Sequence, residues 1–342
     1  MPTPLERLLA AISHKESDRI PILPILLQQG AKELGMPLQE YFTNGEKLAE
    51  GQERLLEKYG HDGVIGVPHV VEDLLAFGQK LVYFPNGAPV LGSMAITRFH
   101  EIDSLRPHDP TEVPELRQTL LAIELLARRF KGKVPIFGAG IAPFSLPSMF
   151  IGTEKWLQLL FDDEQMRLQY LDKFLAVSME FCVNWMNRQL AAGADAVIIA
   201  DGMASATILL RKQFQDWAVP VIKQTISRIN GPVVYEGVGS LGQFAELLPE
   251  LGAVAVVLDR TDDLAACKKV LQGKVAMVGN LNNIAMIDWT PEEIEQQVKT
   301  ACLAAKAGGG FILANQGPEM PYDVPDANIQ AFVEAGKRWG KQ

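Results

Sequence analysis

The sequence predicts an α/β fold, a (β/α)8 barrel of the TIM type. Short, wholly apolar runs of strand length alternate with helix-like stretches, the pattern of a parallel sheet covered on both faces. At least six such units follow one another without a linker or a change in composition, so we expect a single domain over residues 1–342. An open, doubly wound sheet is the alternative.

The first third of the chain contains the less regular elements. Helical spacing of apolar residues predicts helices over 5–13, 46–59 and 114–130. After the first helix, "SDRIPILP" starts an extended segment, and "HDGVIGVPHVVEDLLAFG" is typical of a strand, a loop and a short helix. "QKLVYFPNGAPVLGS" predicts a hairpin that turns at Asn86-Gly87.

From "KVPIFGAGIAPFS" onward the alternation is regular, and each apolar strand after this one follows a helical stretch. The predicted strands are "ADAVIIAD", "PVVYEG", "VAVVLD", "VAMVGN" and "GFILANQG". The helices expected between and after them cover 153–192, 211–230, 241–251, 264–271, 291–307 and 327–341.

Composition excludes some classes of function. The net charge of −9 argues against nucleic-acid binding, which needs a basic surface. No apolar run approaches the ~20 residues of a membrane span, and no signal peptide is visible. The cysteines Cys182, Cys267 and Cys302 are widely spaced, as in a protein with reduced thiols. We therefore expect a cytoplasmic protein, and a homodimer is compatible with the sequence.

Polar residues follow the apolar strands directly. In a barrel the active site lies at the carboxyl ends of the strands, so these residues predict a pocket. Each also has a structural explanation, because an aspartate can cap the next helix and an asparagine can occupy a turn. The residues at these ends are His69, 142–145, Asp201, Tyr235, Glu236, Asp259, Asn280 and 315–319.

Several blocks resemble the uroporphyrinogen decarboxylase superfamily, which includes corrinoid-dependent methyltransferases. "SDRIPILP" is similar to the N-terminal entry of that family, and "VPIFGAGIAPFSLPSMFIG" to its "GPFT" strand and loop. "AVVLDRTDDL", "VAMVGNLNN" and "GFILANQGPEMPYDVPDANI" resemble three later blocks. The resemblance spans essentially the whole chain, and it implies a (β/α)8 barrel with its pocket at the strand carboxyl ends.

The zinc ligands of the methyltransferase branch are not retained. In that branch the fragment matching "YEGVG" carries H-x-C-G, and the closing loop supplies a second cysteine. The matching positions here are Glu236, Val238 and Pro318. Near these positions, only the side chains of Glu236 and Glu319 are candidate metal ligands, and they would bind through oxygen. The resemblance therefore does not determine whether a metal is bound, or whether that metal would be zinc.

The decarboxylase branch differs at other positions. Its RQAGRY motif, which grips the carboxylates of the substrate, matches "LLQQGAKELG", where neither arginine is present. Its pocket aspartate falls at His69, its tyrosine near Met149 and its late histidine at Pro318. A tetrapyrrole with many carboxylates requires fixed positive charge, and the two arginines that would supply it are missing here, although Lys32 lies close by.

Glu236 ends a buried strand where the methyltransferases carry a metal-binding histidine. Its carboxyl could exchange a proton, bind a cationic substrate or bind a metal, or it could simply pair with Arg211 or Arg260. Tyr235 points to the opposite face of a regular strand, and it is a packing residue unless the glycines turn it inward.

The predicted function is transfer of a methyl group between a small methylated substrate and a corrinoid (cobamide) carried by a partner protein. Two alternatives remain, a decarboxylase-like enzyme that uses Asp201 and Glu236 as acid and base, and a non-catalytic binding protein on a barrel scaffold. The candidate catalytic residues are Glu236, Asp201 and Glu319, and the candidate substrate contacts are His69, Tyr235, Met149, Asn280 and Gln316.

Overall fold

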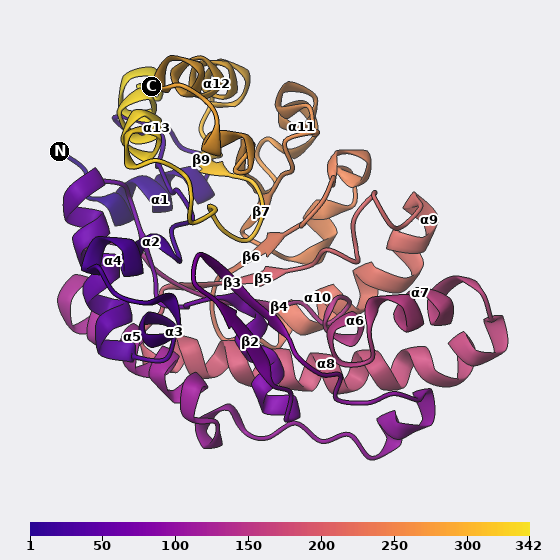
Figure 1. Ribbon diagram of the computed structural model, residues 1–342. Helices are drawn as coiled ribbons and strands as arrows, with labels where there is room; N and C mark the ends of the chain where they lie inside the picture. Colours follow the sequence, from indigo (N-terminus) through magenta and orange to yellow (C-terminus); the bar gives the residue numbers. More distant parts are fainter.

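The computed structural model describes residues 1–342 and contains one curled parallel sheet surrounded by helices (Figure 1). Its strands lie in the order β1-β4-β5-β6-β7-β8-β9, and every neighbouring pair is parallel. The strands are β1 (Val64–Ile65), β4 (Ile136–Ile141), β5 (Ala196–Ala200), β6 (Val233–Glu236), β7 (Ala255–Val257), β8 (Ala276–Leu281) and β9 (Phe311–Asn315).

The extended segment near the N-terminus closes the ring. Ile22 forms a parallel bridge with Leu313 of β9, and the N–H of Leu313 donates to the carbonyl of Pro21 at 2.9 Å. On its other side, the carbonyl of Ile22 accepts from the N–H of Asp62 at 2.8 Å, just before β1. This segment therefore occupies the place of the eighth strand, and the predicted barrel is confirmed.

Helices follow the strands and cover the outside of the ring (Figure 1). The predicted amphipathic stretches form them, and several begin with a side-chain cap, such as Asp163 before α8 and Thr290 before α12. The helices are α1 (Pro4–Ile12), α2 (Gln29–Leu34), α3 (Leu38–Phe42), α4 (Gly45–Tyr59), α5 (Pro114–Phe130), α6 (Leu146–Phe150), α7 (Thr153–Phe161), α8 (Glu164–Ala192), α9 (Arg211–Gln213), α10 (Val219–Ser227), α11 (Leu264–Leu271), α12 (Pro291–Ala305) and α13 (Asp326–Trp339).

Three helix predictions are wrong in detail. The helix expected over 153–192 breaks into α7 and α8, because Asp163 is extended and caps the second helix. The helix expected over 211–230 contains a π-helical turn at Phe214–Ala218 before Pro220, which has no N–H to donate. The helix expected over 241–251 is only two short 3₁₀ turns.

The predicted hairpin is confirmed as β2 (Leu81–Phe84) and β3 (Gly87–Leu91), which pair antiparallel. Two hydrophobic layers hold the barrel together. One cluster lines the lumen, and a larger one fills the space between the strands and the outer helices. None of the helices combines the length and the apolar content that crossing a bilayer requires.

Candidate functional site

Glu236 is the acidic side chain that the fold directs into the barrel. Along β6, Val234 packs in the lumen cluster and Tyr235 in the outer cluster. Because side chains alternate along a strand, Glu236 follows Val234 on the lumen side, at the carboxyl end of β6. The order of residues in this short strand therefore places a carboxyl at the mouth of the barrel.

The surroundings of Glu236 favour its neutral form. The residue is only 3% exposed, and its Oε1 atom has no hydrogen-bond partner. Burial raises the pKa of this carboxyl to about 7. Near neutral pH, Glu236 can therefore act either as an acid or as a base.

Glu319 lies on the loop that follows β9 and also has an unpartnered oxygen, Oε2. Burial raises the pKa of its carboxyl to about 7, against the opposing effect of the neighbouring Gln28 amide. The loop is fixed in place because Gln29, at the start of α2, donates to the carbonyls of Met320 and Pro321 at 3.0 and 2.9 Å. The Asn283 amide also donates to the carbonyl of Glu319 at 2.7 Å.

His69 follows β1 and lies beneath aromatic side chains. Its ring packs edge-on against Phe42 of α3 and Tyr83 of β2, with centroids 5.0 and 6.4 Å away. Burial lowers the pKa of the imidazole to about 3, and Nδ1 has no hydrogen-bond partner. At neutral pH this histidine is an uncharged group.

The N–H of Asp201 donates to the carbonyl of Glu236 at 2.8 Å, but the structure does not bring the two carboxyl groups together. Ala200 is paired with Glu236 in register, so the next residue, Asp201, faces the outer helices. There its Oδ1 accepts from the Ser145 hydroxyl and, at 3.3 Å, from the Ala204 N–H. Asp201 therefore fastens the loops after β4 and β5 to each other, and its Oδ2 is left without a partner.

A buried polar cluster surrounds Asp201. Tyr235 lies beside it, and the carboxylate further raises the already high pKa of that phenol. Burial raises the pKa of Asp201 to about 7. Cys182, on α8, lies near both Asp201 and Asp73, whose charges add to the effect of burial in raising the pKa of its thiol. Tyr235 and Asp201 thus belong to the layer between sheet and helices.

Sequence reasoning missed the acidic pair Glu72 and Asp73. Asp73 accepts from the Ile141 N–H at 2.7 Å, and burial raises the pKa of its carboxyl to about 7. Glu72 accepts from the Thr119 hydroxyl at 2.8 Å, and burial raises its pKa well above the usual value. Two adjacent acids inside the apolar run "VVEDLLAF" were the available signal.

The other predicted contacts fasten the loops at the mouth. Asn280 donates to the carbonyls of Asp259 and Asp262 at 2.8 and 3.1 Å, and it lines a groove of about 410 Å³ beside α11 and α12. Gln316 accepts from the Arg260 N–H at 2.7 Å. The carbonyl of Met149 accepts from the amide of Gln79 at 3.1 Å.

The residues at the family's metal positions do not form a zinc site. Val238 and Pro318 carry no donor atom, and no group of three or more His, Cys, Asp or Glu side chains lies close enough to hold a metal ion. The three cysteines are free and buried. Zinc therefore does not fit the residues present.

Positive charge is also missing from the buried part of the mouth. The only buried cations are Arg7, which pairs with Asp18 and Asp62, and Lys268, which donates to the carbonyl of Gly309. Both lie away from the carboxyl ends of the strands. The mouth therefore offers buried acids and amides without a buried counter-charge.

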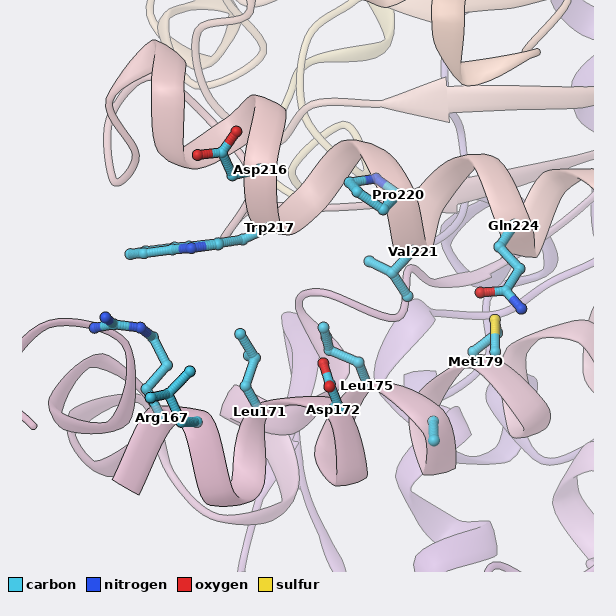
Figure 2. Close-up of a pocket in the computed structure, with 12 residues that line it drawn as sticks. Arg167, Leu171, Asp172, Leu175, Met179, Asp216, Trp217, Pro220, Val221 and Gln224 are labelled. Carbon is cyan, nitrogen blue, oxygen red and sulfur yellow. The ribbon is translucent and has the colours of Figure 1, made fainter. Parts of the chain in front are cut away.

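The outer surface has a separate groove of about 430 Å³ between α8 and α10 (Figure 2). Leu171 and Leu175 of α8 face Val221 of α10 across it, and the guanidinium of Arg167 lies 5.0 Å from the centre of the Trp217 ring. No residue of the barrel mouth lines this groove, so we do not include it in the candidate site.

The fold is a parallel barrel, and several of its buried titratable groups lie at the carboxyl ends of the strands, where barrel enzymes have their active sites. The sequence model of the family described as uroporphyrinogen decarboxylase (URO-D) matches residues 3–339. The chain therefore belongs to the URO-D family, as its sequence blocks predict.

Individual relatives agree with this assignment. A uroporphyrinogen decarboxylase from Psychromonas ingrahamii is 26% identical and the alignment covers 96% of both chains. One from Escherichia coli is 28% identical over 87% of this chain and 85% of its own length. Among solved structures, a methyltransferase from Methanosarcina mazei superposes with a TM-score of 0.88 at 20% identity, covering 99% of both chains. The similarity to the methyltransferase structure shows that the two proteins share a fold.

Proposed function

We propose that the chain is a methyltransferase that moves a methyl group between a small methylated substrate and a corrinoid carried by a partner protein. The observation that supports it best is Glu236, a buried carboxyl in the lumen mouth with a free oxygen and a pKa of about 7. The corrinoid supplies the centre that accepts or donates the methyl group.

The proposed part of Glu236 is proton transfer. In its neutral form it donates a proton to the heteroatom from which the methyl group departs, and it takes that proton back in the reverse direction. A carboxyl with a pKa near the working pH can do both. Glu319 and the side-chain oxygens of Gln28 and Gln29 add unpartnered acceptors near the mouth. These acceptors favour a neutral or cationic substrate that carries N–H or O–H donors.

The same features disfavour a porphyrinogen as the substrate. Many carboxylates would require arginine or lysine to hold them, and neither of the buried cations, Arg7 and Lys268, lies at the mouth. The identity of 26–28% to curated decarboxylases supports a second candidate, cofactor-free loss of CO₂ from another acid. In that reaction, Glu236 would protonate the carbon from which CO₂ leaves.

The test follows methyl transfer from a panel of methylated amines, ethers and thioethers to free cob(I)alamin, read from the absorbance of methylcobalamin. Removing a general acid lowers the rate about 10²-fold or more, so we expect such a loss in Glu236→Gln. Glu250→Gln, which changes an exposed glutamate, is the matched control and should keep the wild-type rate.

The dependence on pH provides a second readout. If the neutral carboxyl donates the proton, demethylation by the wild type falls as the pH rises through about 7, and Glu236→Gln loses this dependence. An unchanged rate in Glu236→Gln would rule out the proposed role. Decarboxylation that proceeds without cobalamin would favour the second candidate, and tight binding without turnover would favour a binding protein.

A further inference from the structure

Several lumen-facing positions of the barrel strands carry small side chains. Bulky, branched residues normally fill the interior of such barrels in layers. Here five strand positions of the lumen cluster are alanine, namely Ala139, Ala196, Ala255, Ala276 and Ala314. Valines and isoleucines occupy most of the other lumen positions.

The result is a cavity of about 230 Å³ inside the ring. Ala196, Ala255 and Ala314 line it from three strands, and Phe137 of β4 lines it as well. Asp195 is the only ionisable residue in the lining, and it is already engaged, because its carboxylate pairs with Lys131 at 2.7 Å. A cavity without free polar groups holds water poorly.

Helix α1 covers the cavity at the amino-terminal end of the barrel. Leu5, Leu8 and Leu9 contribute side chains to the lining. The helix is held in place because the N–H of Leu5 donates to the carbonyl of Lys133 at 3.0 Å, at the start of the segment that forms β4. A capping box at its first turn stabilises the helix itself. This cover lies at the opposite end of the barrel from Glu236.

The cavity has an entrance as well as a cover. Leu9 is 49% exposed and the neighbouring lining residue Pro232 is exposed, whereas Ala255 and Ala314 are fully buried. A molecule can therefore enter between α1 and the start of β6. Because the deepest walls lie within the ring of strands, only a small molecule or a narrow apolar group can reach them.

We propose that this cavity, which opens beside α1 and reaches inward as far as Val257, the register partner of Glu236, is a binding site for a small, uncharged hydrocarbon ligand. A cavity of about 150 Å³ with comparable aliphatic and aromatic walls binds benzene, so this one has room for a somewhat larger group. Binding gains its free energy from apolar contacts that the cavity walls otherwise lack. The proposal does not rest on the proposed methyl transfer.

The experiment uses the whole chain and benzene as the probe. Alanine methyl groups are labelled, and their NMR signals are followed as benzene is added. We expect the signals of Ala196, Ala255 and Ala314 to shift and saturate together. For a chain of 342 residues, benzene at ten times its Kd should raise the unfolding temperature by about 2 °C.

Filling the cavity should abolish binding. Ala255→Leu places a larger side chain in the lumen, and we expect the Kd for benzene to rise at least tenfold. Ala314→Val is a smaller filling change that remains informative if Ala255→Leu does not fold. Ala265→Leu adds the same atoms at an exposed alanine of α11 and should bind like the wild type. Wild-type lumen methyl signals that do not move, or an unchanged Kd in a folded filled variant, would overturn the proposal.

Discussion

Replacing Glu236 with glutamine tests whether burial at the barrel mouth raises the pKa of its carboxyl. The pKa of this group is 4.5 in an unperturbed chain and about 7 in the folded protein. Each pH unit of difference corresponds to about 1.4 kcal/mol, so the interval from 4.5 to about 7 gives about 3 kcal/mol. Below pH 4.5 both states carry the proton, and this carboxyl does not weaken the fold.

The sign of the effect follows from the raised pKa. As the pH rises from 4.5 to 7, the unfolded chain releases the proton first, so the wild type loses up to about 3 kcal/mol of stability. Glutamine resembles the neutral carboxyl and does not titrate. The free energy of unfolding of Glu236→Gln, relative to the wild type, should therefore rise by about 2–3 kcal/mol between pH 5 and pH 8.

Urea unfolding of both proteins at pH 5, 6, 7 and 8 measures this difference directly. The other buried carboxyls titrate in both proteins, so their contributions cancel in the comparison. Glu250→Gln, which changes an exposed glutamate, serves as the control. A constant difference between Glu236→Gln and the wild type across this range would refute the claim that burial raises the pKa of Glu236.

Two further substitutions test the packing of the barrel. In Gly138→Ala the new Cβ would lie 2.1 Å from Oε1 of Gln189, so we expect the free energy of unfolding in urea to fall by about 2–4 kcal/mol. The control Gly87→Ala adds a Cβ at an open position and should lower it by less than about 1 kcal/mol. Asp62→Ala removes the buried partner of two arginines, including Arg19, and should cost about 3–5 kcal/mol. A loss below about 1 kcal/mol in Gly138→Ala or Asp62→Ala would contradict these packing arguments.

The barrel was predictable because its strands are apolar on both faces. "ADAVIIAD" and "VAMVGN" leave no polar side for solvent, so helices must cover one face and a lumen the other. The helix boundaries were harder to predict. The break before α8 depends on Asp163 adopting an extended conformation, and the π-helical turn depends on how the chain accommodates Pro220. Local spacing alone does not reveal either event.

The candidate site was predictable only in part. The spacing along "VVYE" indicates that Glu236 and Tyr235 lie on opposite faces of the strand, and the packing of Val234 in the lumen cluster shows which face is the lumen. Spacing alone likewise does not reveal that Asp201 faces the outer helices, because that depends on Val197 and Ile199, on the same side of β5, packing in the outer cluster. It also does not reveal the hydrogen-bond partner of Asp73, the N–H of Ile141, which lies 68 residues further along the chain.

Closure of the ring by residues near both ends of the chain has a consequence for synthesis. The N–H of Ile25 donates to Oδ1 of Asn315, 290 residues away, and Ile22 bridges to Leu313 of the last strand. During synthesis, most of the barrel therefore emerges from the ribosome before the ring can be completed. Until then the edge of β8 remains unpaired, and open strand edges promote aggregation. Nascent chains shortened before β9 should consequently require chaperones to remain in solution.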